Sequence, residues 1–245
     1  MNLTRRPACL ALGLFLAAAA AVFASGDYED ALVSGSGHVT TENRDVPSFT
    51  AIELEGSGNV TIRPGAARAV TVETDDTILP FIRTEVVGNV LHLGFKPDTH
   101  VGAMTRLEFT VAAPQVEGIT ISGSGNARTT APLHADALSL DIKGSGSITC
   151  NADAGSLQAT IGGSGGITAN GRADRLTVEI RGSGSVHARG LSAVFADVHV
   201  SGSGDASITA SDTVNIRVSG SGSVEYGGGA QANVNSTGSG SVRRY

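Results

Sequence analysis

A strict alternation of apolar and polar residues recurs along the second half of the chain. Apolar residues stand two, four and six positions before a Gly-Ser-Gly tripeptide, as Ile180, Val178 and Leu176 do before Gly182. The residues between them are polar and differ from copy to copy. Successive side chains of a strand point to opposite faces, so the pattern predicts strands with one buried face and one solvated face. A shorter alternation of the same kind follows each tripeptide.

The tripeptide itself repeats with a nearly constant period. Over residues 118–245 its copies begin at Gly123, Gly144, Gly163, Gly182, Gly202, Gly220 and Gly238, in steps of 21, 19, 19, 20, 18 and 18 residues. A period near twenty is typical of a solenoid, whose repeats stack because none can bury its apolar side alone. The sequence therefore predicts an all-β, single-domain parallel β-helix with coils of 18–21 residues. The general bias of parallel connections makes it right-handed.

Glycine suits the corners of such coils. A sharp corner needs backbone angles that residues with a Cβ reach only with strain, and stacked corners about 4.8 Å apart leave little room for side chains. Phosphate and dinucleotide loops need a further glycine or a lysine before a helix, which these copies lack. The predicted corner glycines are Gly56, Gly58, Gly123, Gly125, Gly144, Gly146, Gly163, Gly165, Gly182, Gly184, Gly202, Gly204, Gly220, Gly222, Gly238 and Gly240.

The start of the chain carries a targeting pattern. Arg5 and Arg6 precede an apolar, alanine-rich run that ends in the small-residue site Val22-Phe23-Ala24. We therefore predict a signal peptide over residues 1–24 and an exported protein that is periplasmic, associated with the outer envelope or secreted. A retained anchor is the alternative, but the apolar run of about sixteen residues is short for a membrane span. We expect no membrane span after removal of the signal.

The rest of the chain divides into a polar lead-in, a part with irregular repeats and a part with regular repeats. Residues 25–43 are polar and are predicted to form a loosely ordered lead-in, and residues 44–245 to form the β-helix domain. Coils are expected to be irregular over 44–117 and regular over 118–245. In the irregular part, strand-like runs occupy residues 69–74, 83–87, 90–95 and 106–112. Atypical terminal coils are expected because they shield the open end of the stack.

Asp45-Val46-Pro47-Ser48-Phe49 leads into AIELEGSGNVTI and then into the repeated Gly-Ser-Gly coils. This arrangement resembles the bacterial auto-transporter adhesin, head GIN domain family over residues 46–245. The resemblance implies an exported, single-domain, β-helical protein with an adhesion-like role. It carries over no active site.

Candidate chemistry is sparse. Asp136, Asp174 and Asp212 each stand eight residues before a tripeptide and would form a row if the coils align. Such a row is the basis for the alternative of a glycan-active enzyme, since glycan cleavage uses paired carboxylates. An aspartate before a strand more often caps a turn. Histidines 38, 92, 100, 134, 187 and 199 have no ligand spacing, so we predict surface histidines, no metal site and no cofactor.

The cysteine content and the charge of the chain limit the possible chemistry and the possible partners. After signal removal the only cysteine is Cys150, at an inward strand position, which predicts a packing role. The chain has 23 acidic and 17 basic residues and no basic stripe, so nucleic acid is not expected as a partner. We expect a non-enzymatic protein that binds an envelope protein or surface glycan. A glycan-active enzyme and a purely structural envelope component are the alternatives, and homo-oligomers are compatible with each.

Overall fold

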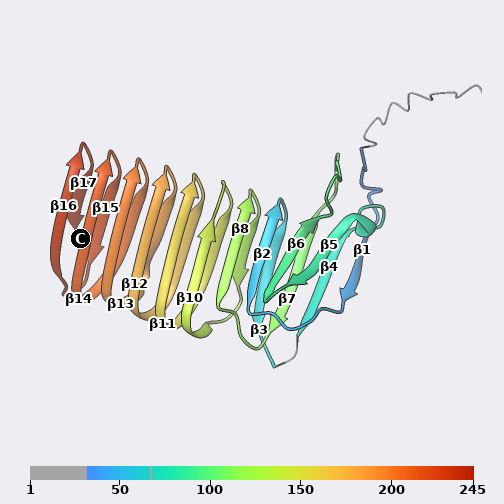
Figure 1. The fold of residues 1–245 in the computed structure, drawn as a ribbon, viewed down its shortest axis with the longest axis horizontal. Coiled ribbons are helices and arrows are strands. Elements are labelled where there is room, and N and C mark those ends of the chain that lie inside the picture. The colour runs from blue at the N-terminus through green and yellow to red at the C-terminus, as the bar shows by residue number, and fades with distance from the viewer. Residues whose placement is uncertain (1–31, 67) are drawn as a thin grey trace, which may run out of the picture. The chain divides into compact units, whose positions relative to one another are not determined.

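The computed structural model describes residues 32–66 and 68–245, and these form a β-solenoid of about seven turns with about 19 residues per coil. The predicted signal peptide and the first residues of the lead-in lie outside the described residues. No α-helix occurs in the described part, where η1 (Leu79–Phe81) is a single 3₁₀ turn. Figure 1 shows the coils side by side, from the C-terminal coil of β16 and β17 to the coils near β1. The predicted fold class is confirmed.

Strands account for nearly all of the coil stack. The first nine are β1 (Val39–Arg44), β2 (Ala51–Gly56), β3 (Asn59–Pro64), β4 (Ala69–Asp75), β5 (Ile82–Val87), β6 (Val90–Phe95), β7 (Leu107–Ala113), β8 (Gly118–Gly123) and β9 (Asn126–Thr129). The others are β10 (Leu133–Ile142), β11 (Ser147–Gly163), β12 (Gly166–Gly182), β13 (Ser185–Gly202), β14 (Asp205–Gly220), β15 (Ser223–Gly227), β16 (Gln231–Gly238) and β17 (Ser241–Arg244).

The regular coils stack in parallel with their tripeptides in register. Gly163 pairs with Gly182, and Gly182 pairs with Gly202. Each strand from β11 to β14 runs from one corner to the next without a break. The polar segment between the two alternating runs of each coil is therefore strand as well. Its main-chain groups pair with those of the neighbouring coil, as Asp153 does with Arg172.

The core is the bore of the solenoid. The inward positions two, four and six residues before the tripeptide are buried for the copies at Gly144, Gly163, Gly182, Gly202 and Gly220, and Leu176, Val178 and Ile180 are at most 1% exposed. Cys150 lies in the same kind of inward row and is fully buried. Burial of aliphatic surface at about 25 cal/mol per Å² is the main stabilising term for such a stack, because the coils hold no disulfide between them.

The N-terminal coils do not stack in chain order. Strand β2 pairs in parallel with β8 on one side and with β6 on the other, and β3 lies in the same way between β9 and β7. The coil of β2 and β3 thus lies between a coil formed later, by β6 and β7, and the coil of β8 and β9 (Figure 1). Gly56 pairs directly with Gly123, 67 positions later, and the chain between them forms β3, the outer coil of β6 and β7 and the antiparallel strands β4 and β5.

Three antiparallel strands close this end of the stack. Strand β4 pairs with β7, β1 pairs with β4, and β5 forms a hairpin with β6. The part of the chain expected to form irregular coils therefore contains antiparallel strands, which the sequence pattern does not predict. A terminal coil has no further coil to cover it, and reversing the chain lets short strands cover the edge instead. The four strand-like runs match β4 to β7 within one or two residues.

Part of the predicted lead-in is ordered, which corrects the expectation of a loose segment. Residues 39–43 belong to β1, and Val33 forms a parallel bridge with Val101. The carboxylate of Asp75 fixes the segment in place: it accepts hydrogen bonds from the main-chain N–H of Gly37 and that of Thr105, both at 2.7 Å. Asp75 is fully buried, so these donors replace the water that the charge would otherwise need.

The C-terminal coil pairs with the preceding coil through β16 and β17, and side-chain contacts hold its end in addition. The Tyr245 ring lies against Gly227, where a Cβ would meet the ring at 2.4 Å, and the guanidinium of Arg189 stacks on it at 4.3 Å. The Tyr245 hydroxyl donates a hydrogen bond to the Ile208 carbonyl oxygen at 3.1 Å. Glu225 forms ion pairs with both Arg189 and Arg243. These contacts tie the last strand to β13 and β14.

Candidate functional site

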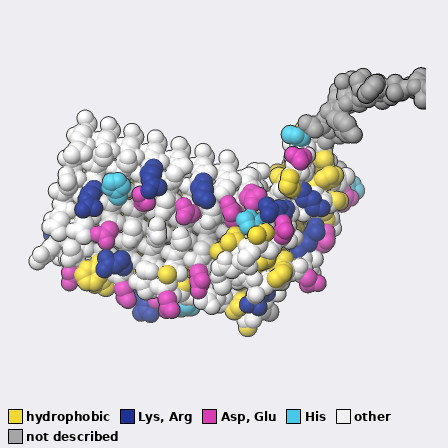
Figure 2. Space-filling view, in the orientation of Figure 1, with side chains coloured by type: hydrophobic (Ala, Val, Ile, Leu, Met, Phe, Trp, Pro, Cys, Tyr) yellow, Lys and Arg dark blue, Asp and Glu magenta, His cyan; other side chains and the backbone are white. Residues whose placement is uncertain are grey.

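The parallel register aligns one outward residue from each coil into a continuous line along the stack, here called the outer row. It consists of Glu85, His92, Glu53, Thr120, Asp141, Thr160, Glu179, His199, Arg217 and Asn235. Acidic, basic and uncharged side chains follow one another in it at the spacing of the strands, about 4.8 Å. Figure 2 shows charged side chains of both signs spread across the coils, with hydrophobic side chains at the N-terminal coils and a smaller hydrophobic group on the C-terminal coils.

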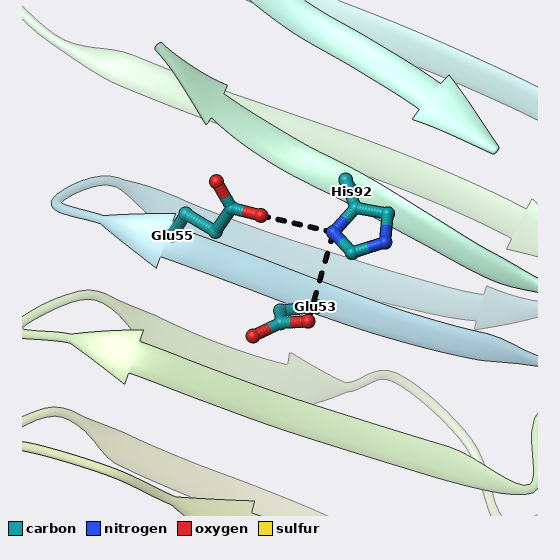
Figure 3. Close-up of side chains that lie close together, drawn as sticks. All are labelled: Glu53, Glu55 and His92. Carbon is teal, nitrogen blue, oxygen red and sulfur yellow. Dashed lines mark hydrogen bonds and ion pairs between the residues drawn. The ribbon is translucent and has the colours of Figure 1, made fainter. Parts of the chain in front are cut away.

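Three residues of the N-terminal coils form a compact cluster at this row. Register pairs Glu53 of β2 with His92 of β6, and Glu55 lies two residues further along the same face of β2. His92 Nδ1 is 2.9 Å from Glu55 Oε1 and 3.6 Å from Glu53 Oε2. Figure 3 shows the three side chains pointing toward one another from neighbouring strands. Their nearest ligand atoms all lie within 4.8 Å of one another.

Neighbouring side chains hold the two carboxylates in place. Ser122 Oγ donates a hydrogen bond to Glu53 Oε1 at 2.7 Å, and Arg83 Nη1 lies 3.2 Å from Glu55 Oε1 and 3.3 Å from Glu55 Oε2. Arg83 also bonds to Glu85 through Nε at 3.1 Å. The side chains of His92, Glu53 and Glu55 are 18%, 23% and 35% exposed, so the cluster is partly packed but open to solvent.

This cluster could hold a divalent cation, since imidazole nitrogen and carboxylate oxygen are common ligands of such ions in proteins. The sequence reading missed it and treated His92 as a scattered surface histidine. The Glu-x-Glu spacing within one strand was visible, because residues i and i+2 share a face. The proximity of His92 was not visible, because the local sequence does not show that a residue 39 positions after Glu53 lies on the neighbouring strand.

Two of the three predicted acids share a shallow hollow on another face. The register places Asp136 and Asp174 on either side of Gly155, two strand spacings or about 9.6 Å apart. A Cβ on Gly155 would meet the Asp136 carbonyl oxygen at 2.8 Å, so this close approach needs a glycine. The hollow is lined by Gln115, His134, Ala135, Asp136, Asp153, Ala154, Gly155, Arg172 and Asp174.

Asp153 is the paired carboxylate of this hollow. Arg172 donates to both of its oxygens and His134 Nδ1 lies 3.1 Å from Oδ2. The hydrogen bond from Arg172 is the largest cause that holds the pKa of Asp153 below its ordinary value. A carboxylate held ionised by an arginine is a poor general acid.

Asp212 does not join the other two acids. It lies further along the stack, where it accepts a hydrogen bond from Thr213 Oγ1 at 2.7 Å. Asp212 lies within β14, and this hydrogen bond joins two side chains of the same strand. The three aspartates therefore do not form one site.

Cys150 is buried as predicted, and burial raises the pKa of its thiol to about 12. Since the thiolate is the reactive form, the thiol is inert in the folded protein.

The corner glycines lie where the coils approach most closely. A Cβ on Gly182 would meet the carbonyl oxygen of Gly163 at 2.4 Å, and its φ of +134° is one that other residues rarely adopt. The carbonyl oxygen of Gly163 also accepts the main-chain N–H of Ser183 at 2.9 Å. The tripeptide thus serves the stacking of coils rather than the binding of a ligand.

The comparisons with known proteins agree with this architecture. Residues 48–230 match the family model described as "Putative auto-transporter adhesin, head GIN domain". The chain belongs to this family. No curated protein matches the sequence. None of the helices in the described part of this head GIN domain is both long and apolar enough to cross a bilayer.

Three solved structures share the fold of this head GIN domain. A putative adhesin from Bacteroides fragilis is 22% identical with a TM-score of 0.83, and covers 87% of this chain and 100% of its own. A putative lipid binding protein from Parabacteroides distasonis is 20% identical with a TM-score of 0.73, covering 87% and 99%. A putative adhesin from Parabacteroides merdae is 22% identical with a TM-score of 0.72, covering 87% and 98%.

Proposed function

We propose that this head GIN domain is an exported, non-enzymatic, adhesion-like protein that binds an envelope protein or a surface glycan through its outer row. The observation that supports this most directly is the outer row itself. Outward side chains of both charges repeat at fixed spacing on coils whose inward sides are fully packed. Such a surface is preorganised, and little conformational entropy is lost when a long partner binds along it.

The names of the structural neighbours support this function in coarse terms only. Two of them are called putative adhesins, and one is called a putative lipid binding protein. For this chain we favour adhesion over lipid binding. The inward aliphatic rows fill the bore, and the hollow beside Asp153 is lined mainly by polar side chains. Lipid acyl chains need an apolar pocket, which neither of these features supplies.

The test compares two variants with matched chemistry. In the first, Glu179→Gln, His199→Gln and Arg217→Gln remove an acid, a histidine and a base from the outer row. In the control, Asp205→Asn, His187→Gln and Arg128→Gln remove the same three kinds of side chain from exposed positions after the corners. Retention on envelope fractions and on a glycan array is measured for both variants and for the wild type.

We expect the outer-row variant to lose at least tenfold in affinity, about 1.4 kcal/mol, and the control to bind like the wild type. Equal loss in both variants, or no captured envelope protein or glycan at all, would contradict the proposal.

A glycan-active enzyme is the second candidate, because Asp136 and Asp174 share a hollow with His134 and Arg172. Polysaccharide turnover that disappears in the triple variant Asp136→Ala, Asp174→Ala and Asp212→Ala would favour this candidate. Turnover unchanged by the three substitutions would remove these residues from consideration.

A further inference from the structure

We infer that Glu53, Glu55 and His92 bind a divalent transition-metal ion such as Zn²⁺ or Mn²⁺. This inference does not depend on the adhesion proposal. It rests on the convergence of three ligand-type atoms from two strands, on their charge, and on the contacts that orient them. The cluster is also distinct from every residue that the sequence singled out as a candidate site.

The distances are close to those of a coordinated ion. Ligands at about 2.1 Å from a zinc ion can be no more than about 4.2 Å from one another. His92 Nδ1 lies 2.9 Å from Glu55 Oε1 and 3.6 Å from Glu53 Oε2, and all three atoms lie within 4.8 Å. Binding therefore needs shifts of a fraction of an ångström in two glutamate side chains.

The charges of the cluster favour a cation. The carboxylates of Glu55 and Glu85 share one guanidinium, that of Arg83, and the carboxylate of Glu53 faces His92. The formal charges of the three carboxylates and the guanidinium sum to −2, and Nδ1 of His92 carries at most one hydrogen although two carboxylates face it. A divalent ion neutralises the group and satisfies both carboxylates at once.

The surrounding contacts leave the needed atoms available. Ser122 occupies Glu53 Oε1, so that Oε2 faces His92. Arg83 can keep its contact with Glu55 Oε2 while Oε1 turns to the ion. Coordination through Nδ1 of His92 places the ring hydrogen on Nε2. Outer contacts of this kind orient the ligands of most metal sites in proteins.

The ligand set indicates which ion fits. One imidazole and two carboxylates suit zinc, manganese and related ions, whereas calcium takes six to eight oxygen ligands. Three protein ligands leave at least one position for water or for an oxygen of a bound molecule.

The experiment is isothermal titration of the metal-free full chain with Zn²⁺, Mn²⁺ and Ca²⁺. We expect one Zn²⁺ or Mn²⁺ per chain and no comparable binding of Ca²⁺. Glu53→Gln and His92→Ala should each weaken binding at least tenfold, and Ser122→Ala should weaken it less. The control is His134→Ala, which removes a histidine that also faces a carboxylate, Asp153, and it should leave binding unchanged.

Circular dichroism of each metal-free variant checks that the fold is kept, and Glu53→Gln preserves the shape of the side chain if His92→Ala destabilises β6. Absence of binding at micromolar protein and metal would overturn the inference. Binding that His92→Ala and His134→Ala weaken to the same extent would also overturn it, by showing adventitious binding to surface histidines.

Discussion

The coils of residues 118–245 and those of residues 39–113 belong to the same β-solenoid, but they differ in the order in which their strands stack. In the regular coils each strand pairs with its counterpart one period away, as Gly163 does with Gly182. In the N-terminal coils the chain first adds a coil on one side of β2 and then one on its other side, so β2 lies between β6 and β8. Regular stacking aligns equivalent positions of successive repeats. The rearranged stacking brings together residues of different repeats, and it builds the cluster of Glu53, Glu55 and His92.

The largest expected effect tests the close stacking of the regular coils. Gly182→Ala places a Cβ 2.4 Å from the Gly163 carbonyl oxygen at a φ of +134°. Gly56→Ala has the strain of a positive φ, +81°, but its Cβ meets nothing within 4 Å. We expect a loss of about 3 kcal/mol of unfolding free energy for Gly182→Ala and about 1 kcal/mol for Gly56→Ala, measured by urea denaturation.

Gly166→Ser is the control for this pair. Gly166 pairs with Ser147 and Ser185 in the neighbouring coils, and its Cβ would have no neighbour nearer than 3.9 Å. The substitution should change stability by less than about 0.5 kcal/mol. Equal losses at Gly56 and Gly182 would show that corner strain, and not contact between coils, makes glycine necessary.

The next effect belongs to the N-terminal coils and depends on pH. The main-chain N–H of Thr105 is the largest cause that lowers the pKa of Asp75 below its ordinary value, and the Thr105 hydroxyl and the Gly37 N–H act in the same direction. A lowered pKa in the folded state stabilises the protein above the unfolded value of about 3.9. This stabilisation is lost as the pH falls through the folded pKa.

Asp75→Asn should therefore destabilise the protein at neutral pH, because the amide cannot accept from all these donors. Denaturation curves between pH 7 and pH 2 should show the difference from the wild type shrinking below about pH 4. Asp174→Asn, at an exposed position of the regular coils, should follow the wild type throughout. A constant difference at every pH would contradict the role assigned to the Asp75 charge.

The smallest effect compares two arginines. Arg181 pairs with Glu179 on the regular coils and is 63% exposed, whereas Arg83 is 24% exposed and bonds to both Glu55 and Glu85. Arg181→Ala should cost less than about 0.5 kcal/mol, as exposed ion pairs generally do. Arg83→Ala should cost about 1 kcal/mol, because it leaves neighbouring carboxylates without their counter-charge. A reversed order, measured by thermal or urea unfolding, would contradict the packing described for the cluster.

The sequence predicts the regular coils well because every repeat carries the same alternation of apolar and polar residues around its Gly-Ser-Gly tripeptide. The inward rows, the in-register corners and the strand runs over 69–74 and 90–95 all follow from local alternation. Local alternation gives neither strand direction nor partner, so the antiparallel β4 and the insertion of β2 between β6 and β8 could not be read from it. One local signal was overlooked: Gly88-Asn89, with φ of +64° at Gly88, is a typical two-residue hairpin turn between β5 and β6.

The candidate sites differ in the same way: those in the regular coils could be predicted from the sequence, and the cluster in the N-terminal coils could not. Asp136 and Asp174 could be placed from spacing alone, because they lie in regular coils two periods apart. The partners of Glu53 could not be predicted from spacing, because His92 and Ser122 contact it only through the pairing of strands that are distant in sequence.

The order of the N-terminal coils is tested most directly by disulfide formation between paired cysteines, in a background without Cys9 and Cys150. In this structure Thr120 pairs with Glu53, whereas His92 lies one strand beyond, about 9.6 Å from Thr120. A disulfide needs Cα atoms within about 7 Å. Glu53→Cys with Thr120→Cys should therefore form a disulfide under mild oxidation, and His92→Cys with Thr120→Cys should not. The opposite result would show that the coils stack in chain order.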